Sequence, residues 1–197
     1  MAGQAQHVEM HRKILLRRDL LVRALPGAVY VPFIGDGDIA AQVYADRMVY
    51  GADLDPARVA TCRARLDGGA DVRVADCNGW PFAGCGATFA VADFDAYAYP
   101  YDSFRSFFLS DTQKADRLVV FFTDGERQAV NRSGNFRTPD GENHHITAVK
   151  EKRPYFNFWL QKYCLPWLKE AAAPYRVVTH RGYLRDTMLY WGAVLAS

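Results

Sequence analysis

A short apolar run, a glycine turn and the start of a helix follow one another over Val29–Ala40, with the sequence VYVPFIGDGDIA. Glycine in such a turn lets the backbone approach a ligand closely, and the first turn of the next helix offers free N–H groups. A glycine turn is a weak signal when it stands alone, because plain connections between a strand and a helix use it as well. The strands and helices expected on either side of the turn decide whether it binds a ligand or only connects a strand to a helix.

Apolar runs and helical spacings alternate on both sides of this turn. Strands are expected over residues 28–34, 47–53, 71–76, 88–95 and 117–123, and helices over residues 7–24, 39–46, 56–66 and 102–109. Alternation of this kind predicts an α/β domain with a parallel sheet and helices on both faces. We expect one domain over residues 1–197.

The second half of the chain departs from that rhythm. Residues 125–145 are rich in Gly, Asn, Arg and Asp and are expected to form an insertion loop, with a mobile lid, a phosphate-gripping loop or a plain flexible loop as its possible roles. A helix over residues 154–172 follows, with Pro166 as a kink or break. Residues 175–183 and 187–195 then predict a terminal hairpin, which gives seven strands with an antiparallel last strand.

Carboxylates stand at the ends of the second and third expected strands. Asp53 ends the second strand, where an acid can accept both hydroxyls of a ribose, and Asp55 before Pro56 is the expected cap of the next helix. Asp76 and Cys77 end the third strand. Each acid alone could be a surface residue or a helix cap, but their order after the glycine turn indicates a nucleoside-binding site. A nicotinamide cofactor is the competing interpretation, although Ala40 stands where that fingerprint has its third glycine.

The fourth expected strand stops on two acids, Asp93 and Asp95, which are followed by Tyr97 and Tyr99. Acidic and aromatic groups together suit a site that grips a flat ligand bearing an amine. Tyrosines at such a position also pack as core or rim residues, so ordinary packing is the alternative.

These motifs together resemble the class I S-adenosylmethionine-dependent methyltransferases. Gly51–Pro56 is similar to their second motif, and the Pro-Phe-x-Gly-x-Gly form of Pro32–Gly37 is similar to methyltransferases of base amines in DNA and RNA. Asp95–Pro100 resembles the strand-end signature of the tRNA guanine dimethyltransferase family, and Arg18–Leu20 and Thr123-Asp124 are similar to other elements of that family. We expect no counterpart of the family's carboxyl-terminal RNA-binding domain within residues 1–197.

The resemblance implies a Rossmann-like seven-stranded methyltransferase sheet, and S-adenosylmethionine as cofactor. It implies methyl transfer to an exocyclic amine of a nucleobase, with RNA ahead of DNA. Asp95 would then polarise the amine, Tyr97 would stack on the base, and Asp93 would support the strand end. No metal is required. The cofactor-binding residues that it implies are Arg18, Pro32, Phe33, Gly35, Asp36, Gly37, Asp53, Leu54, Asp76 and Cys77.

Two departures keep other functions open. Val31 stands where base-amine methyltransferases usually carry an acid, and Ala96 stands where the family has proline. The alternatives are a methyltransferase of a small molecule or protein, and a catalytically degenerate protein that only binds the cofactor.

Composition and charge limit the kinds of partner and location to expect for this protein. Half of the residues are hydrophobic and 14% are aromatic, which favours a folded domain over disorder. The net charge of +2 does not demand nucleic acid, although the basic stretches His11–Arg23 and Gly125–Arg153 could flank a phosphate backbone or form solvated faces. Four cysteines without a CxxC pair indicate reduced thiols. Without a secretory or membrane-spanning segment, we expect a cytoplasmic protein.

Overall fold

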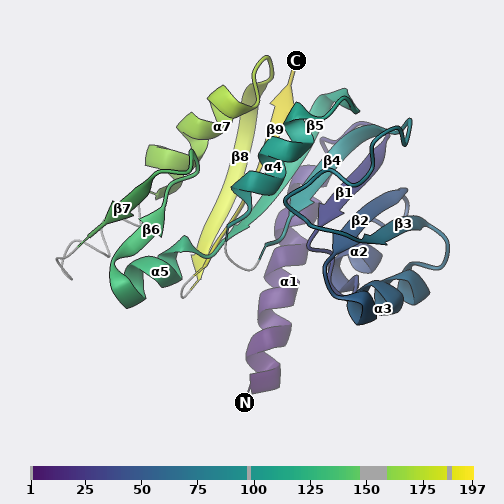
Figure 1. The fold of residues 1–197 in the computed structure, drawn as a ribbon, viewed down its shortest axis with the longest axis horizontal. Helices are drawn as coiled ribbons and strands as arrows, with labels where there is room; N and C mark the ends of the chain where they lie inside the picture. Colours follow the sequence, from purple (N-terminus) through teal and green to yellow (C-terminus); the bar gives the residue numbers. More distant parts are fainter. Residues whose placement is uncertain (1, 97–98, 147–158, 186–187) are drawn as a thin grey trace.

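The computed structural model describes residues 2–96, 99–146, 159–185 and 188–197 (Figure 1). A seven-stranded sheet runs through it in the order β3-β2-β1-β4-β5-β9-β8. Strands β1 to β5 are parallel to one another, and β9 is antiparallel to both β5 and β8. The expected fold class is therefore confirmed. The strands are β1 Ala28–Pro32, β2 Val49–Asp53, β3 Ala70–Val74, β4 Thr88–Phe94, β5 Gln113–Asp124, β8 Arg176–Arg185 and β9 Met188–Ala196.

Helices cover both faces of the sheet (Figure 1). One face packs against the first three helices through a core that includes Leu20, Val59 and Val119. The other face packs against the later helices through a mainly aromatic core. The helical segments are α1 Ala2–Leu21, α2 Asp38–Val43, α3 Pro56–Leu66, α4 Tyr101–Leu109, α5 Glu126–Ser133, the π-helical turn η1 Leu160–Cys164 and α7 Leu165–Ala171.

Aromatic rings cross the sheet on its second face. Phe94 stacks on Phe122 with ring centroids 5.4 Å apart, and Phe122 stacks on Trp191 at 4.3 Å. These residues are register partners on β4, β5 and β9. The row explains why apolar runs without alternation form the central strands, since both faces of each strand are buried.

Residues 125–145 were expected to be a loop, and that expectation is wrong. They form α5 and a two-stranded hairpin of β6 Asn135–Arg137 and β7 Asn143–His145. Asp124 accepts the N–H of Glu126 at the start of α5, and Glu126 accepts the N–H of Arg137 at 2.8 Å. Side-chain acceptors therefore organise a segment that carries little apolar periodicity.

The hairpin of β6 and β7 is stabilised by its turn and by a stacked pair of rings. Thr138 donates its N–H to the carbonyl of Glu142 at 2.9 Å, and Phe136 stacks on His144 at 5.3 Å. The turn sequence Thr138–Glu142 contains Pro-Asp-Gly, which is a strong turn signal.

The helix expected over residues 154–172 lies partly outside the described residues. Its described part is helical up to Ala171 and contains the π-helical turn η1, which ends at Cys164, two residues before Pro166. Proline lacks the N–H that an α-helix needs and crowds the carbonyl four residues earlier, so a wider turn accommodates it. Of the helices described, none combines the length and apolar character needed to span a membrane.

Candidate functional site

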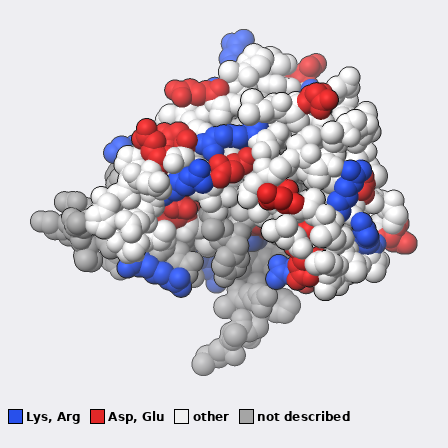
Figure 2. All heavy atoms as spheres, viewed as in Figure 1, with Lys and Arg blue, Asp and Glu red and all other residues white. Residues whose placement is uncertain are grey.

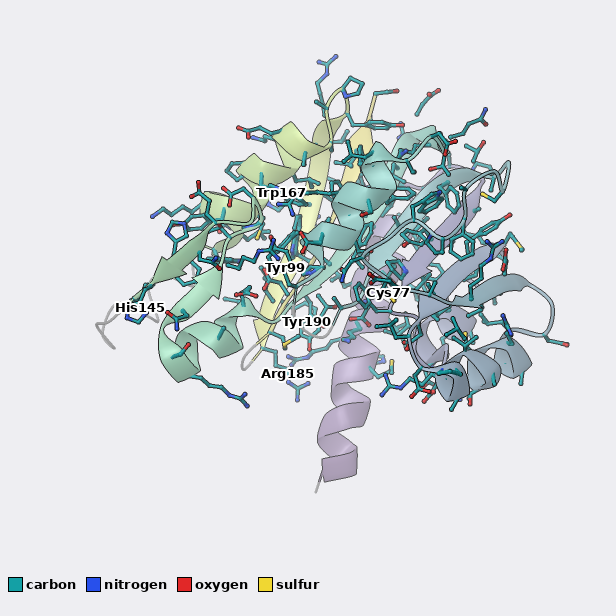
Figure 3. All side chains as sticks on the ribbon, in the orientation of Figure 1. Cys77, Tyr99, His145, Trp167, Arg185 and Tyr190 are labelled. Atoms are coloured by element: carbon teal, nitrogen blue, oxygen red, sulfur yellow. The ribbon has the colours of Figure 1, made fainter. Side chains whose placement is uncertain are left out.

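The strand order of the sheet reverses at β1: strands β2 and β3 follow on one side of it, and β4 and β5 on the other. Strand β1 is therefore the topological switch point. Ligands of open α/β sheets bind outside the carboxyl ends of the strands at such a point. A cavity of about 470 Å³ lies there, lined by residues from the ends of β2, β3 and β4 and from α1 and β9. Cys77 and Tyr190, which come from opposite halves of the sheet, both face it (Figure 3).

The glycine turn after β1 is held by the carboxylate of Asp53. Gly35 donates its N–H to Asp53 Oδ2 at 3.1 Å, and the backbone N–H of Asp55 donates to Asp53 Oδ1 at 2.9 Å. Gly35 has φ +56°, and a Cβ added there would meet no atom within 4 Å. The turn therefore presents bare backbone to open space beside Asp53, as a ligand cradle requires.

The end of β3 closes the same cavity. Cys77 Sγ accepts the N–H of Phe33 at 3.3 Å and donates to the carbonyl of Ala52 at 3.4 Å. Burial raises the pKa of the Cys77 thiol to about 11, so it is neutral and works as a hydrogen-bonding group. Asp76 and Leu54 lie beside it on the cavity wall, both exposed.

Gly37 fixes where α2 begins, and replacing it tests the turn. Gly37→Ala is expected to lower the free energy of unfolding by about 2–5 kcal/mol. Gly37 has φ +78°, which costs an L-residue about 1–2 kcal/mol. The added Cβ would also stand 2.7 Å from Cys62 Sγ, and such crowding costs about 1–3 kcal/mol.

Urea unfolding measures the loss, and Gly35→Ala is the matched control. Gly35 also has positive φ but no close neighbour, so only the conformational cost of about 1–2 kcal/mol is expected there. Cys62→Ala in the Gly37→Ala background should restore part of the stability. Equal losses at both glycines would contradict the packing argument.

Asp93 is buried in the middle of the protein and does not face the cavity of about 470 Å³. Arg17 Nε and Nη2 donate to its two oxygens at 2.6 and 2.7 Å, and the hydroxyl of Tyr44 donates at 2.7 Å. Burial alone would lower the pKa of Arg17, but the charges of Asp93 and Asp95 raise it above its ordinary value. Asp93 therefore anchors α1 to β4.

Asp95 faces the cavity and is already engaged. Lys13 Nζ donates to its oxygens at 2.9 and 3.0 Å, the hydroxyl of Thr123 donates to Oδ1, and Arg17 Nη2 lies 3.7 Å from Oδ2. Burial alone would raise the pKa of Asp95, but the charges of Arg17 and Lys13 and the Thr123 hydroxyl together lower it. Asp95 is thus an ionised carboxylate at the cavity wall.

The remaining expected site residues are spread more widely. Asp36 and Gly35 line a second cavity of about 180 Å³, and Pro32 is buried at the end of β1. Arg18 lines neither this cavity nor the one of about 470 Å³. Its side chain is exposed and donates to the carbonyl of Gln42 at 3.2 Å. Tyr97 lies outside the described residues.

Lys13 was missed by the sequence argument, although a signal for it exists. Lys13 and Arg17 stand one helical turn apart on α1, in a stripe that continues to the buried Leu20. An acid inside a buried strand needs a cation. Asp93 within β4 therefore called for basic residues on an apolar helix face, and α1 supplies them.

A second buried carboxylate lies beyond the cavity. Asp124 at the end of β5 accepts hydrogen bonds from the Tyr101 hydroxyl, from Trp159 Nε1 at 2.9 Å and from the N–H of Glu126. Burial raises the pKa of Asp124 despite these donors. The network ties α4, α5 and the residue before η1 to the sheet, on the side of the cavity formed by β5.

Comparison with known proteins establishes the fold. No protein-family model and no curated protein matches the chain. Solved structures do match. An S-adenosylmethionine-dependent methyltransferase from Mesorhizobium loti is 15% identical with a TM-score of 0.57, covering 90% of this chain and 95% of that one. Geranyl diphosphate C-methyltransferase from Streptomyces coelicolor A3(2), solved with S-adenosyl-L-homocysteine, is 12% identical with a TM-score of 0.57, covering 97% and 80%.

The [4+2]-cyclase SpnF is another match, with 15% identity, a TM-score of 0.57 and coverage of 94% of this chain and 80% of that one. At these identities the likeness shows the fold, which is the Rossmann-like methyltransferase fold. Because a cyclase shares it, the chemistry has to be argued from the site.

Proposed function

We propose that this protein binds S-adenosylmethionine at the switch point of the sheet and transfers its methyl group to an acceptor. The observation that carries the proposal is Asp53, which stands at the end of β2, holds the glycine turn at 3.1 Å and faces the cavity of about 470 Å³. Several structural neighbours were solved with S-adenosylhomocysteine or sinefungin. A fold likeness supports the proposal without establishing it.

The residues present fit this cofactor. Each oxygen of Asp53 holds one backbone N–H and keeps lone pairs for the two hydroxyls of a ribose. The exposed Leu54 would offer an apolar surface beside it for adenine, and Asp76, which lines the same cavity, would accept from the adenine amino group. The cavity volume lies in the range of ligand pockets. Once bound there, the cofactor supplies an electrophilic methyl group on its sulfonium.

For the acceptor, we infer that a small molecule is the better candidate. Two of the basic residues in the first basic stretch turn inward, Arg17 to Asp93 and Lys13 to Asp95, which weakens the case for a phosphate-binding face there. On the face in Figure 2, acidic and basic side chains intermingle instead of gathering by sign. Neighbours that act on small molecules, such as a didemethyltoxoflavin methyltransferase, are consistent with this choice.

A nucleobase amine is the second candidate. Asp95 stands at the end of β4, where amino-methyltransferases place the group that polarises the amine, and it is ionised. Both of its oxygens accept from Lys13, so a substrate amine would first have to displace that side chain.

Calorimetry with S-adenosylhomocysteine tests the cofactor, and binding at micromolar concentrations is expected. Absence of binding would overturn the proposed function. Incubation with methyl-labelled cofactor and separate tRNA, DNA, protein and small-molecule fractions then tests the acceptor. Label in the small-molecule fraction supports the first candidate, and label in tRNA or DNA supports the second.

A further inference from the structure

Lys13 and Asp95 form an ion pair where two cavities meet. Both residues line the cavity of about 470 Å³ that contains Asp53 and the cavity of about 180 Å³ beside Gly35. A ligand that extends from Asp53 past the glycine turn would therefore reach this pair. In S-adenosylmethionine, the part that extends from the ribose is an α-amino acid with one ammonium and one carboxylate.

The pair is accessible from the cavities. The side chains of Lys13 and Asp95 are 19% and 15% exposed, whereas those of Arg17 and Asp93 are 1% exposed. Lys13 Nζ donates to both oxygens of Asp95 and also lies 5.2 Å from the centre of the Tyr190 ring. Lys13 is thus the charged group at this junction that has a long side chain able to swing.

Asp95 is held in place without Lys13. Thr123 donates to Oδ1, and Arg17, itself fixed by Asp93, lies 3.7 Å from Oδ2. If Lys13 turned away, the carboxylate would keep these two partners and its orientation. The position that Lys13 occupies between the two oxygens would then be free for another cation.

Charge balance decides which ligand can open the pair. Lys13 and Arg17 balance the charges of Asp95 and Asp93, two cations against two anions. A ligand with a single charge would unbalance this largely buried cluster, which is costly. A ligand with adjacent ammonium and carboxylate groups replaces one ion pair by two. The Lys13–Asp95 pair therefore favours a zwitterion.

We propose that Lys13 and Asp95 exchange their mutual ion pair for contacts with the amino-acid end of the cofactor, Lys13 binding its carboxylate and Asp95 its ammonium. This inference rests on the proposed function. It assigns Asp95 to the cofactor in place of the acceptor amine. It also makes α1, through Lys13, a part of the cofactor site.

Calorimetry with two ligands separates the amino-acid end from the nucleoside. S-adenosylhomocysteine carries the zwitterion, and 5′-methylthioadenosine has a methyl group in place of that chain. Lys13→Met, which keeps the length of the side chain and removes its charge, should weaken binding of S-adenosylhomocysteine about ten- to hundredfold. Its affinity for 5′-methylthioadenosine should stay within about threefold, which is less than one charged hydrogen bond contributes.

Matched variants complete the design. Arg12→Met removes a neighbouring charge of α1 that lies outside both cavities, and it should leave both affinities unchanged. Asp95→Asn should weaken S-adenosylhomocysteine selectively, as Lys13→Met does. Urea unfolding of each variant shows whether it retains its fold.

The titrations separate a failure of the zwitterion site from a failure of the proposed function. If the unaltered protein binds neither ligand, the proposed function fails and the inference with it. If it binds both and Lys13→Met weakens both equally or neither, the proposed function stands and the zwitterion site is overturned. Selective loss of S-adenosylhomocysteine in Lys13→Met and in Asp95→Asn supports the site.

Discussion

Replacing Arg17 by methionine is expected to lower the free energy of unfolding by about 3–5 kcal/mol. The guanidinium and the carboxylate of Asp93 are both about 1% exposed and meet in two hydrogen bonds of 2.6 and 2.7 Å. Without Arg17, the charge of Asp93 would remain buried, and among the residues that the structure describes the Tyr44 hydroxyl would be its one remaining side-chain donor. The loss comes mainly from that uncompensated charge.

Two further variants test this explanation at equilibrium in urea. Arg18→Met removes the next residue, which is exposed and makes one hydrogen bond to the carbonyl of Gln42, so a change of about 0.5 kcal/mol is expected. The double variant Arg17→Met/Asp93→Asn buries no charge and should be more stable than Arg17→Met alone. A double variant that is less stable than the single one would show that the ion pair is not the cause.

Asp53→Ala is expected to weaken binding of S-adenosylhomocysteine by a hundredfold or more. The carboxylate is proposed to accept both ribose hydroxyls, and each hydrogen bond to a charged group contributes about 1.5–3 kcal/mol. The variant also removes the acceptor that holds the N–H of Gly35 at 3.1 Å, so the glycine turn loses its support. The lost hydrogen bonds and the loss of support for the turn should both weaken binding of S-adenosylhomocysteine.

Asp55→Ala is the control for Asp53→Ala in the same calorimetric titration. Asp55 lies two residues away and caps α3 by accepting the N–H of Ala57 at 2.8 Å. Its loss should cost about 0.5–2 kcal/mol of stability and leave the affinity nearly unchanged. If Asp53→Ala bound the ligand as tightly as the unaltered protein, the nucleoside would have to lie elsewhere.

The parts of the fold that follow from local chemistry were predictable. Helix α3 begins at Pro56 and ends at Leu66 as expected, because Asp55 caps it and proline suits its first turn. The buried strands show as apolar runs. Asp53, Asp76 and Asp95 line one cavity because parallel strands bring their carboxyl ends to the same edge.

The rest depends on contacts between residues that are distant in the chain. Sequence motifs pointed to Arg18, but the structure turns Arg17 inward, since only the packing of α1 decides which neighbour faces Asp93. The segment from α5 to β7 has weak apolar periodicity and is organised by polar contacts such as that between Glu126 and the N–H of Arg137. Such contacts leave no pattern in the local sequence.

The position of β9 has a consequence for biosynthesis. Strand β8 comes before β9 in the chain but is connected to the rest of the sheet only through it, since β9 lies between β5 and β8. On the ribosome, β1 to β5 can pair as they emerge, whereas β8 must wait for the strand that follows it. Until Met188–Ala196 has left the exit tunnel, the edge of β5 stays unpaired and open to other chains.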